Sequence, residues 1–572
     1  MGAVGRAAFE NVGSKPRRDL ATGAWFVVSL CFAVAALVLC YGAEPLDHGY
    51  TRYATIAFEM VRSGDWIAPH LDGRLYVDKP PLAMWLIAAA MAIANSTASF
   101  TQQAPNAVAL LLSVLFLRRL GARIFGRADA GWLAAGLYLS ALLPFTLLRD
   151  KRIDPLLTAF LLGALDFLQA ALGSQQRPRA RRCNWLGAAL LLAAATLTKG
   201  PLALIFFVTI AIATAAWTRR LRTLASLDVV AAATLYCALV ALWPLAMIHH
   251  GGFAAWSERL AERDLVSRFA GPLHYIVKLP LRLAPWALLL PALALALRRL
   301  LRGEAGAALR FPVTWFSVVF VLLHVTSAKH SRYLLPAFPA ALLVCVALWI
   351  TPETGAAAAL SPRARKLRDG ALTFLLALGT IAGIAAPLAP LWVPAARSLW
   401  PALALGGALA AIGAIAALRR MRAGADSIAI LARAIVVILL IEAGFDLLRS
   451  AKYLANDDLA AARIALADVA AGTPTLLLQL HGDTHNALLL TTRQPLALGR
   501  TSDDVRHFAQ ANGAAIVVAR PEALAALRAE PDLAVGEAAP LRIAGKQLAV
   551  ATLRATAIEP RAAAPEPIPQ RR

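Results

Sequence analysis

Residues 24–43 read AWFVVSLCFAVAALVLCYGA and carry no charged side chain. An uninterrupted apolar run of about 20 residues is long enough to form a helix that crosses the hydrocarbon core of a bilayer. Runs of this kind recur along the chain as far as Leu448. The whole sequence is 59% hydrophobic and 16% charged, whereas an average soluble domain is about half apolar and a quarter charged. The sequence therefore predicts a polytopic membrane protein.

The apolar runs predict an all-α membrane domain of about thirteen transmembrane helices. One further apolar stretch, 82–98, is also long enough to cross, and the arginine clusters between the runs decide against it. If 82–98 stays outside, these clusters share one side with the basic N-terminal segment, as expected of cytoplasmic loops. We therefore expect 82–98 to form a short helix that lies on the outer surface or re-enters it. The predicted spans are 24–43, 104–120, 130–148, 155–173, 184–198, 201–218, 228–249, 284–298, 311–327, 333–351, 371–392, 398–418 and 427–448.

The net charge of +23 does not predict nucleic-acid binding, because the arginines sit in short clusters between apolar runs. The first run follows basic residues as in a signal peptide, but no small-residue cleavage site follows Tyr41, so we expect an uncleaved first helix. The five cysteines lack the spacing of metal ligands and are interpreted as small membrane-embedded side chains. They are residues 31, 40, 183, 237 and 345.

This predicted membrane topology divides the chain into four parts. Residues 1–23 are predicted to be a cytoplasmic segment, and 24–450 a transmembrane domain with an outer loop over 44–103. Residues 451–557 are predicted to form a small outer α/β domain, and 558–572, rich in Pro and Ala, a disordered tail. In the α/β part, helical patterns at 458–471, 503–512 and 521–529 alternate with strand-like segments at 474–480, 514–520 and 547–553.

Charged residues of both signs gather in the outer segments, so the predicted chemistry faces outward. Glu44 and Asp47 follow the first span directly, and Asp78 and Lys79 close the same loop. Acids from both ends of a folded-back loop can meet at one site, where a carboxylate acts as a general base or holds a divalent cation. An ordinary solvated loop is the alternative.

Two further acids belong to one predicted span. Asp154 begins it, where a carboxylate either caps the helix or takes part in chemistry. Asp166 lies inside the span, where an acid is costly, and the sequence names no partner for it.

Several cations lie at outer turns. Lys199 stands at the tip of a helix hairpin, where it either snorkels to the interface or contacts a phosphate. Anionic lipid headgroups are the alternative partner for the whole group. The cations are Lys79, Lys199, Arg268, Lys329 and Arg332. The string 481-HGDTH-485 contains metal-ligand residue types, but no further cluster lies near it, and we do not interpret it as a metal site.

The stretch 52-RYATIAFEMVRSGDWIAPHLDGRLYVDKPPLAMW-85 resembles the first outer loop of the lipid A aminoarabinose transferases and the protein O-mannosyltransferases (PMT), which are GT-C glycosyltransferases. The resemblance covers roughly residues 24–350 and extends to the C-terminal α/β domain of the bacterial aminoarabinose transferases. Five later strings match in order and rough spacing: 152-RIDPLLTAF-160, 197-LTKGP-201, 268-RF-269, 285-PW-286 and 329-KHSRYLLPAFP-339.

The resemblance implies an inverting transfer of a sugar from undecaprenyl phosphate, without a nucleotide sugar, to an envelope acceptor. Lipid A is the expected acceptor, and the expected location is the periplasmic face of the bacterial inner membrane. The resemblance makes Asp47, Glu44 and Asp154 the candidate catalytic acids. The candidate phosphate-binding residues are Lys79, Lys199, Arg268, Lys329, Arg332 and Tyr333.

The chain departs from the family pattern before the RYA run. The family has an acidic pair there, and this chain has Gly49 and Tyr50. Asp47 would have to substitute, with Glu44 in reserve.

The acid–His pair that the family places before RF is also changed, because Asp264 and Leu265 occupy those positions. No cofactor is certain. A divalent metal cation is the candidate, with Asp78 and His274 as ligands and His48 as an alternative to His274.

Three other functions stay open at this stage. The acceptor of a glycosyltransferase of this kind could be a protein or another glycan. A lipid-linked sugar transporter would need more polar residues through the membrane centre than this chain has. A non-catalytic member that binds a partner is the third alternative, because Gly49 and Tyr50 stand where acids are expected.

Overall fold

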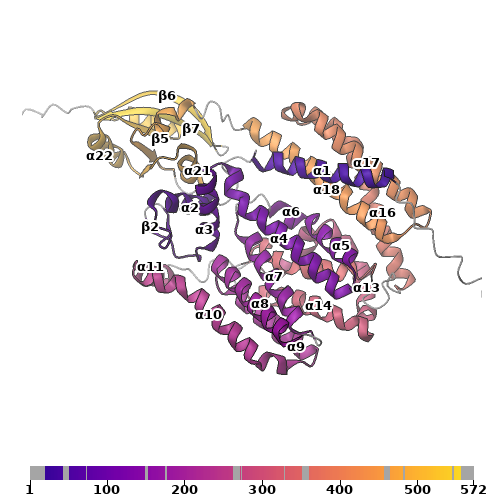
Figure 1. The fold of residues 1–572 in the computed structure, drawn as a ribbon. Helices are drawn as coiled ribbons and strands as arrows, with labels where there is room; N and C mark the ends of the chain where they lie inside the picture. The colour runs from indigo at the N-terminus through magenta and orange to yellow at the C-terminus, as the bar shows by residue number, and fades with distance from the viewer. Residues whose placement is uncertain are drawn as a thin grey trace, which may run out of the picture.

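The computed structural model describes residues 20–42, 51–71, 74–147, 152–173, 177–261, 271, 273–326, 329–350, 360–456, 464–480, 483–543 and 546–555. The described chain is mostly helical as far as Asn456, and a five-stranded sheet with short helices follows (Figure 1). The predicted, mostly helical fold is confirmed. That the C-terminal part is a separate domain outside the membrane stays a prediction.

The predicted spans all overlap helical segments of the structure, some of which are broken. The span predicted at 130–148 is divided between α5 and α6, and the one at 333–351 between η3 and α15. The N-terminal helices are α1 (Leu20–Gly42), α2 (Thr51–Ser63), α3 (Leu82–Ala94), α4 (Ser99–Phe125), α5 (Ala128–Leu139), α6 (Leu142–Leu147), α7 (Asp154–Ala171), α8 (Pro178–Lys199), α9 (Leu202–Trp217), η1 (Leu221–Ala225), α10 (Leu227–Ile248) and α11 (Gly252–Ala261). The later ones are α12 (His274–Leu283), η2 (Trp286–Leu289), α13 (Leu290–Leu300), α14 (Gly303–Val325), η3 (Ser331–Ala337), α15 (Phe338–Val346), α16 (Pro362–Ala385), η4 (Ala386–Leu391), η5 (Pro394–Leu399), α17 (Trp400–Arg422) and α18 (Ser427–Asn456).

Six helices among the described residues are long and apolar enough to cross a membrane, and a pair bent by 106°, His274–Leu283 with Trp286–Leu300, makes a seventh candidate. The chain is therefore a multi-pass membrane protein, and the predicted number of thirteen spans is not confirmed. The difference arises because apolar runs such as Leu202–Trp217 and Ser331–Val346 form helices that are shorter or interrupted.

Helix α3 occupies the stretch 82–98 whose crossing was in question. Its 13 residues extend over about 20 Å, which is less than the roughly 30 Å of a hydrocarbon core. It packs against α2 and α4. This length supports the prediction that the stretch does not cross.

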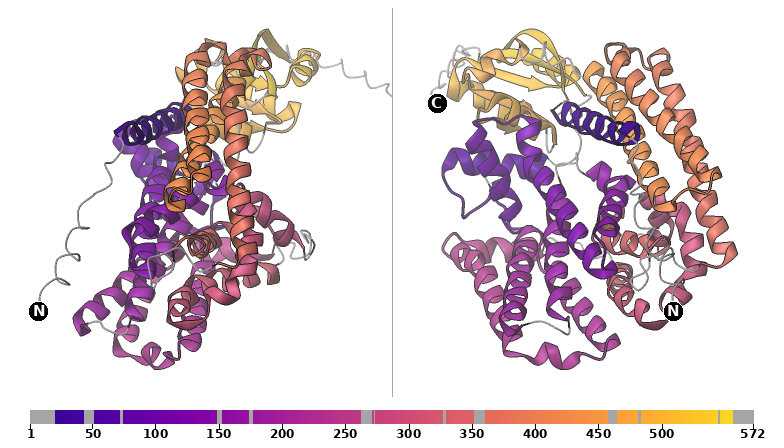
Figure 2. Two further views of the ribbon diagram at one scale, coloured as in Figure 1. Left: turned by 90° about the vertical axis from the view of Figure 1, so that its right-hand side faces the viewer. Right: turned by 45° about the vertical axis from the view of Figure 1, so that its right-hand side comes forward.

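Helix α1 lies beside α17 and α18, so the two ends of the helical part meet (Figure 2). The Trp25 indole donates a hydrogen bond to the carbonyl of Leu409 at 3.0 Å. A Cβ atom at Gly413 would lie 2.0 Å from the Trp25 ring. Only glycine therefore fits at position 413 against this ring.

The C-terminal sheet has the strand order β4-β3-β5-β7-β6. β3 pairs in parallel with β4 and β5, while β7 pairs antiparallel with β5 and β6. Side chains alternate between two hydrophobic clusters, one containing Leu477 and Val518 and the other Leu476 and Val517. The strands are β3 (Thr475–Leu478), β4 (Ala497–Gly499), β5 (Ala515–Ala519), β6 (Leu533–Ile543) and β7 (Lys546–Ala555), and the helices are α20 (Ala467–Ala470), α21 (Asp483–Thr492), α22 (Ser502–Asn512) and α23 (Pro521–Arg528).

Sequence reasoning placed β3, β5, β7, α22 and α23 at their observed positions and missed α21, β4 and β6. β4 is only three residues long, and β6 contains Pro540. Proline is tolerated in β6 because this strand lies at the edge of the sheet.

Helix α21 connects the sheet to helices α2 and α3. Leu489 and Leu490 belong to the same hydrophobic cluster as Tyr53 and Met84. The Thr97 hydroxyl also donates to the carbonyl of Leu490 at 2.9 Å. The C-terminal part therefore packs on the helices that follow α1.

A short two-stranded ribbon lies between α2 and α3. Its strands are β1 (His70–Leu71) and β2 (Arg74–Leu75), which pair antiparallel.

Candidate active site

A buried carboxylate with two cations forms the centre of the site. Asp154 opens α7, and its Oδ1 accepts a hydrogen bond from Lys199 Nζ at 2.5 Å. Its Oδ2 lies 3.7 Å from Nε of Arg332 in η3. Only 6% of the Asp154 side chain and 10% of the Lys199 side chain are exposed. Breaking a buried ion pair of this kind is strongly destabilising, so the three side chains hold one another in place.

The turn 329–333 adds an aromatic ring to this cluster. Lys199 Nζ lies 4.2 Å from the ring centroid of Tyr333, and the Arg332 guanidinium lies 5.2 Å from it. His330 packs edge-on against the same ring at 5.2 Å. A cation over an aromatic face is attracted by the ring quadrupole. Tyr333 therefore orients the two cations that Asp154 pairs with.

Two tyrosines of the segment between α1 and α3 form a hydrogen-bonded pair, and Tyr53 of this pair lies close enough to Asp154 to be affected by its charge. The Tyr53 hydroxyl, from α2, hydrogen-bonds to Tyr76, which also accepts from Arg52. Burial raises the pKa of Tyr76 to about 12, and the Asp78 carboxylate acts in the same direction. Burial, followed by Tyr76 and Asp154, raises the pKa of Tyr53 well above its usual range. Both hydroxyls are therefore protonated at neutral pH and can donate hydrogen bonds.

The loop that carries Asp78 and Lys79 is stabilised by hydrogen bonds between the Asp65 side chain and backbone N–H groups. Asp65 Oδ1 accepts from the N–H groups of Ile67 and Ala68, at 2.9 Å and 3.0 Å. These hydrogen bonds, that of Ala68 foremost, keep the pKa of Asp65 below its usual range despite some burial.

Two indoles attach the same loop to neighbouring helices. Trp85 of α3 donates to the carbonyl of Trp66 at 2.6 Å, and Trp243 of α10 donates to that of Ile67 at 3.0 Å. The GDW turn of the sequence motif thus fixes the loop between two helices.

A cavity of about 680 Å³ opens between this loop and α10. A typical small-molecule site has about 300–1,000 Å³. Asp78, Lys79 and Lys199 form its charged part. Its remaining wall is mainly apolar and comes largely from α10 and α11, with Val77 and Pro80 of the loop and the Gly200–Pro201 turn completing it. That wall contains Trp243, Leu245, Met247, Ile248, Phe253 and Trp256. A charged end facing an apolar wall suits a ligand with a phosphate at one end and a hydrocarbon chain at the other.

The structure thus brings together several of the predicted site residues from four parts of the chain. They are Asp78, Lys79, Asp154, Lys199, Arg332 and Tyr333. Lys329, also predicted, lies half-buried at the start of the turn that carries Arg332. The predicted residues Glu44, Asp47 and Arg268 lie outside the described ranges.

The metal prediction is not supported by any cluster in the described part of the chain. No group of three or more His, Cys, Asp or Glu side chains that could hold a metal ion occurs there. His274, at the start of α12, stacks edge-on against Tyr275, and its charged neighbours are Lys278 and Lys329. Cations repel a metal ion, so these surroundings do not favour His274 as a ligand. The metal roles of Asp78 and His274 stay predictions.

Sequence reasoning missed the two tyrosines and the aromatic cavity wall. Tyr53 lies within the RYA run, so its position in the recognised loop was the available signal. Trp243, Phe253 and Trp256 occur in and just after a predicted span, where aromatic residues are common at any membrane interface. Their convergence on Lys199 depends on the packing of α8 against α10.

Residues 78–246 match the family model described as dolichyl-phosphate-mannose-protein mannosyltransferase. The crystal structure of ArnT from Cupriavidus metallidurans bound to undecaprenyl phosphate superposes with a TM-score of 0.72 at 20% identity, over 93% of this chain and 98% of that one. The predicted resemblance to the GT-C glycosyltransferases is confirmed. The chain has the fold of that ArnT.

Proteins with similar sequences include several that are named as aminoarabinose transferases. An undecaprenyl phosphate-α-4-amino-4-deoxy-L-arabinose arabinosyl transferase of Pseudomonas fluorescens is 30% identical over 56% of this chain and 58% of its own length. One from Edwardsiella ictaluri is 30% identical over 64% of this chain and 65% of its own. The chain thus spans about three fifths of the length of these curated relatives.

Proposed function

We propose that this protein is an inverting glycosyltransferase that moves a sugar from a polyprenyl-phosphate donor to lipid A at the periplasmic face of the bacterial inner membrane. The observation that carries the proposal is the cavity in which Lys79 and Lys199 face an apolar wall. The names of the relatives, which specify undecaprenyl phosphate and an aminoarabinose, support the donor class. The arginine clusters support an outward-facing site and a topology of about thirteen spans.

The charge of the site suits a phosphate. Asp154 is one carboxylate shared by two cations, Lys199 and Arg332. The cluster therefore keeps a net positive charge, and it lies in a partly buried region where electrostatic interactions are stronger than in water. The donor phosphate would bind at Lys199 and Lys79, while its isoprenoid chain would lie along the aromatic wall from α10 and α11 and continue into lipid.

The chemistry is a direct displacement at the anomeric carbon of the sugar. An acceptor oxygen forms a bond to that carbon as the bond to the donor phosphate oxygen breaks. The bonding electron pair leaves with the polyprenyl phosphate, whose developing charge is stabilised by Lys79 and Lys199. An acceptor phosphate on lipid A is already ionised and needs positioning more than a base. A hydroxyl acceptor would transfer its proton to a carboxylate, for which Asp47 and Glu44 are the candidates.

Asp154 acts in this proposal by positioning Lys199. Its two oxygens face Lys199 and Arg332, so the carboxylate holds these two cations in place. This refines the sequence-based prediction, in which Asp154 was a candidate catalytic acid.

The test is sugar transfer in membranes that contain the wild-type chain, Lys199→Met or Lys546→Met, supplied with polyprenyl-phosphate sugars including the aminoarabinose donor. Lys546 lies in the C-terminal sheet and serves as the matched control. Mass spectrometry of lipid A and of other envelope glycans gives the readout. A sugar-sized mass gain that Lys199→Met loses and Lys546→Met keeps supports the proposal. An equal gain in all three chains contradicts the site, and no gain on any acceptor contradicts the transferase function.

A further inference from the structure

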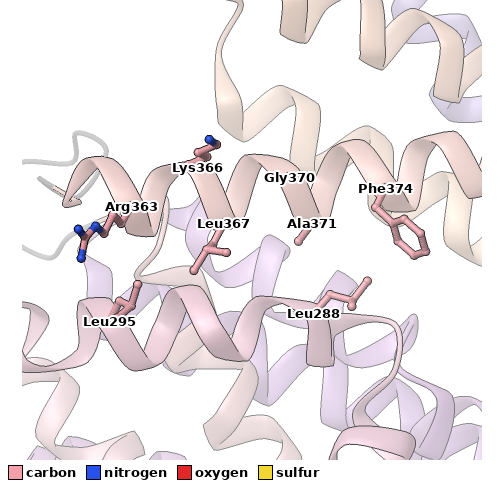
Figure 3. Close-up of a pocket in the computed structure, with 8 residues that line it drawn as sticks. All are labelled: Leu288, Leu295, Arg363, Lys366, Leu367, Gly370, Ala371 and Phe374. Carbon is pink, nitrogen blue, oxygen red and sulfur yellow. The ribbon is translucent and has the colours of Figure 1, made fainter.

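A second cavity lies away from the candidate active site, between α13 and α16 (Figure 3). Its volume is about 580 Å³. Leu288 and Leu295 approach it from one side, and Leu367 and Phe374 from the other (Figure 3). These four side chains are between 41% and 58% exposed. The cavity is therefore an open apolar groove along the outside of the helical part.

One end of the groove is strongly basic. Arg363 and Lys366, in the first turns of α16, line it, and neither makes an ion pair with another residue of the described chain. Leu295 lies at this same end (Figure 3), just before Arg298 and Arg299 in the last turn of α13. The N-terminus of α16 adds the positive end of its helix dipole. Two lining cations and a helix N-terminus thus lie at one end, where Arg298 and Arg299 follow Leu295 within one turn of α13. The opposite end contains no charged lining residue.

The length of the groove matches one leaflet of a bilayer. Arg363 and Phe374, at its two ends in Figure 3, are separated along α16 by about 16 Å at 1.5 Å per residue. Half of a hydrocarbon core is about 15 Å. A lipid whose headgroup phosphate meets the cations would therefore lay one acyl chain along the whole apolar floor.

The middle of the groove is open because residue 370 has no side chain. A Cβ atom added at Gly370 would meet no heavy atom within 4 Å. The leucines and Phe374 thus form walls around an unfilled strip, which the hydrocarbon chain of a lipid would fill.

We propose that this groove is a binding site for an anionic phospholipid of the leaflet on the arginine-rich side of the membrane. Basic pockets between membrane helices at that interface attract anionic headgroups. Zwitterionic lipids carry the same phosphate but no net charge, so the cations select against them. The bound lipid would bridge α13, which follows the site-proximal helices, and α16, which begins the C-terminal helix group. Its predicted effect is stabilisation of the contact between these two groups, independently of sugar transfer.

The test uses the full-length chain purified in mild detergent, with dioleoyl phosphatidylglycerol and dioleoyl phosphatidylcholine as probes. Native mass spectrometry measures the retained lipid, and thermal unfolding measures the midpoint in each lipid. We expect phosphatidylglycerol to be retained preferentially and to raise the midpoint. Removing one cation should reduce phosphatidylglycerol retention about fivefold, as each Lys or Arg near an anionic surface does. Arg363→Gln and Lys366→Gln are the variants, and Arg365→Gln, exposed on the same helix but outside the groove, is their control.

A variant that changes size but not charge tests whether the lipid binds in the groove or only to the charged surface. Gly370→Phe should fill the unfilled strip and reduce retention, whereas Ile381→Phe, at another exposed position of α16, should not. Equal retention of the two lipids by the wild-type chain would overturn the proposal. Retention of phosphatidylglycerol at the wild-type level by every variant would also overturn it. If undecaprenyl phosphate were retained in place of phosphatidylglycerol, the groove would be a polyprenyl site and the phospholipid assignment would fail.

Discussion

Lys199 Nζ lies 2.5 Å from Oδ1 of Asp154, although 45 residues separate the two along the chain. Lys199 ends α8 and Asp154 begins α7, and the two helices pack along their length. Of this pair, Lys199 lines the cavity. The pair therefore couples a residue that lines the cavity to a carboxylate that fixes its position.

This coupling predicts that Asp154 and Lys199 act as a unit. Lys199→Met should lower the rate of transfer by about 10²–10³, the loss seen when one transition-state charge stabiliser is removed. Asp154→Asn should also lower it, because Lys199 loses its anchor. The double variant should be no worse than Lys199→Met alone, since groups acting through one another are not additive. Initial rates in proteoliposomes at matched protein content check this. A double variant slower than Lys199→Met by the full effect of Asp154→Asn would mean that Asp154 has an independent role.

Filling the cavity should weaken donor binding. Ala241 lines the cavity on α10, and Ala241→Phe introduces a ring where the proposed isoprenoid chain lies. We expect the KM for the polyprenyl-phosphate donor to rise at least about tenfold, which corresponds to about 1.4 kcal/mol, with little change in the unfolding midpoint. Ala238→Phe, at an exposed position on the same helix, is the control. The same KM in both variants would mean that the donor does not occupy this wall.

The turn at Asp65 should contribute stability that depends on pH. The pKa of Asp65 is lowered in the folded chain, chiefly by the N–H of Ala68. A lowered folded pKa means that the contribution is present above the unfolded pKa of about 4 and is lost as the pH falls through the folded value. Asp65→Asn should therefore lower the unfolding midpoint at pH 7, by the equivalent of about 0.5–1 kcal/mol for a partly exposed site.

This difference from the wild-type chain should shrink when the pH is lowered from 7 to about 3. Thermal unfolding at a series of pH values measures it. A difference that is constant across the series would show that the charge of Asp65 is not what the turn uses.

Asp166 should be a structural residue. It is fully buried on α7 and pairs with Arg119 at 2.6 Å and Arg123 at 2.7 Å, both from α4. Asp166→Ala leaves two partly exposed arginines without their counter-ion, and we expect a loss of about 1.5–3 kcal/mol in the free energy of unfolding. Asp129→Ala removes a more exposed pair with Arg127 and should cost about 0–1 kcal/mol. Chemical unfolding in detergent compares the two variants. Equal stability losses would contradict the distinction between them.

The sequence predicted site residues best where a short local motif contained them. The DKPP end of the first outer loop and the TKGP hairpin identified Lys79 and Lys199, which the structure brings to one cavity. Asp166 was recognised as anomalous, but its partners were not, because Arg119 and Arg123 were assigned to a cytoplasmic charge cluster. Their spacing of four residues places both on one face of α4, and that face meets α7 only through tertiary packing.

The sequence by itself determined the membrane class, the mostly helical fold and the resemblance of the first outer loop, because apolar length, arginine placement and short motifs are local properties of the chain. Tertiary structure alone decided which apolar runs form long helices and which form short or interrupted ones. The point where a helix ends depends on the packing of neighbouring helices as well as on its own residues. It also decided that Lys199 pairs with Asp154 under the ring of Tyr333. Contacts between residues so far apart depend on how whole helices pack, and no local pattern specifies that packing.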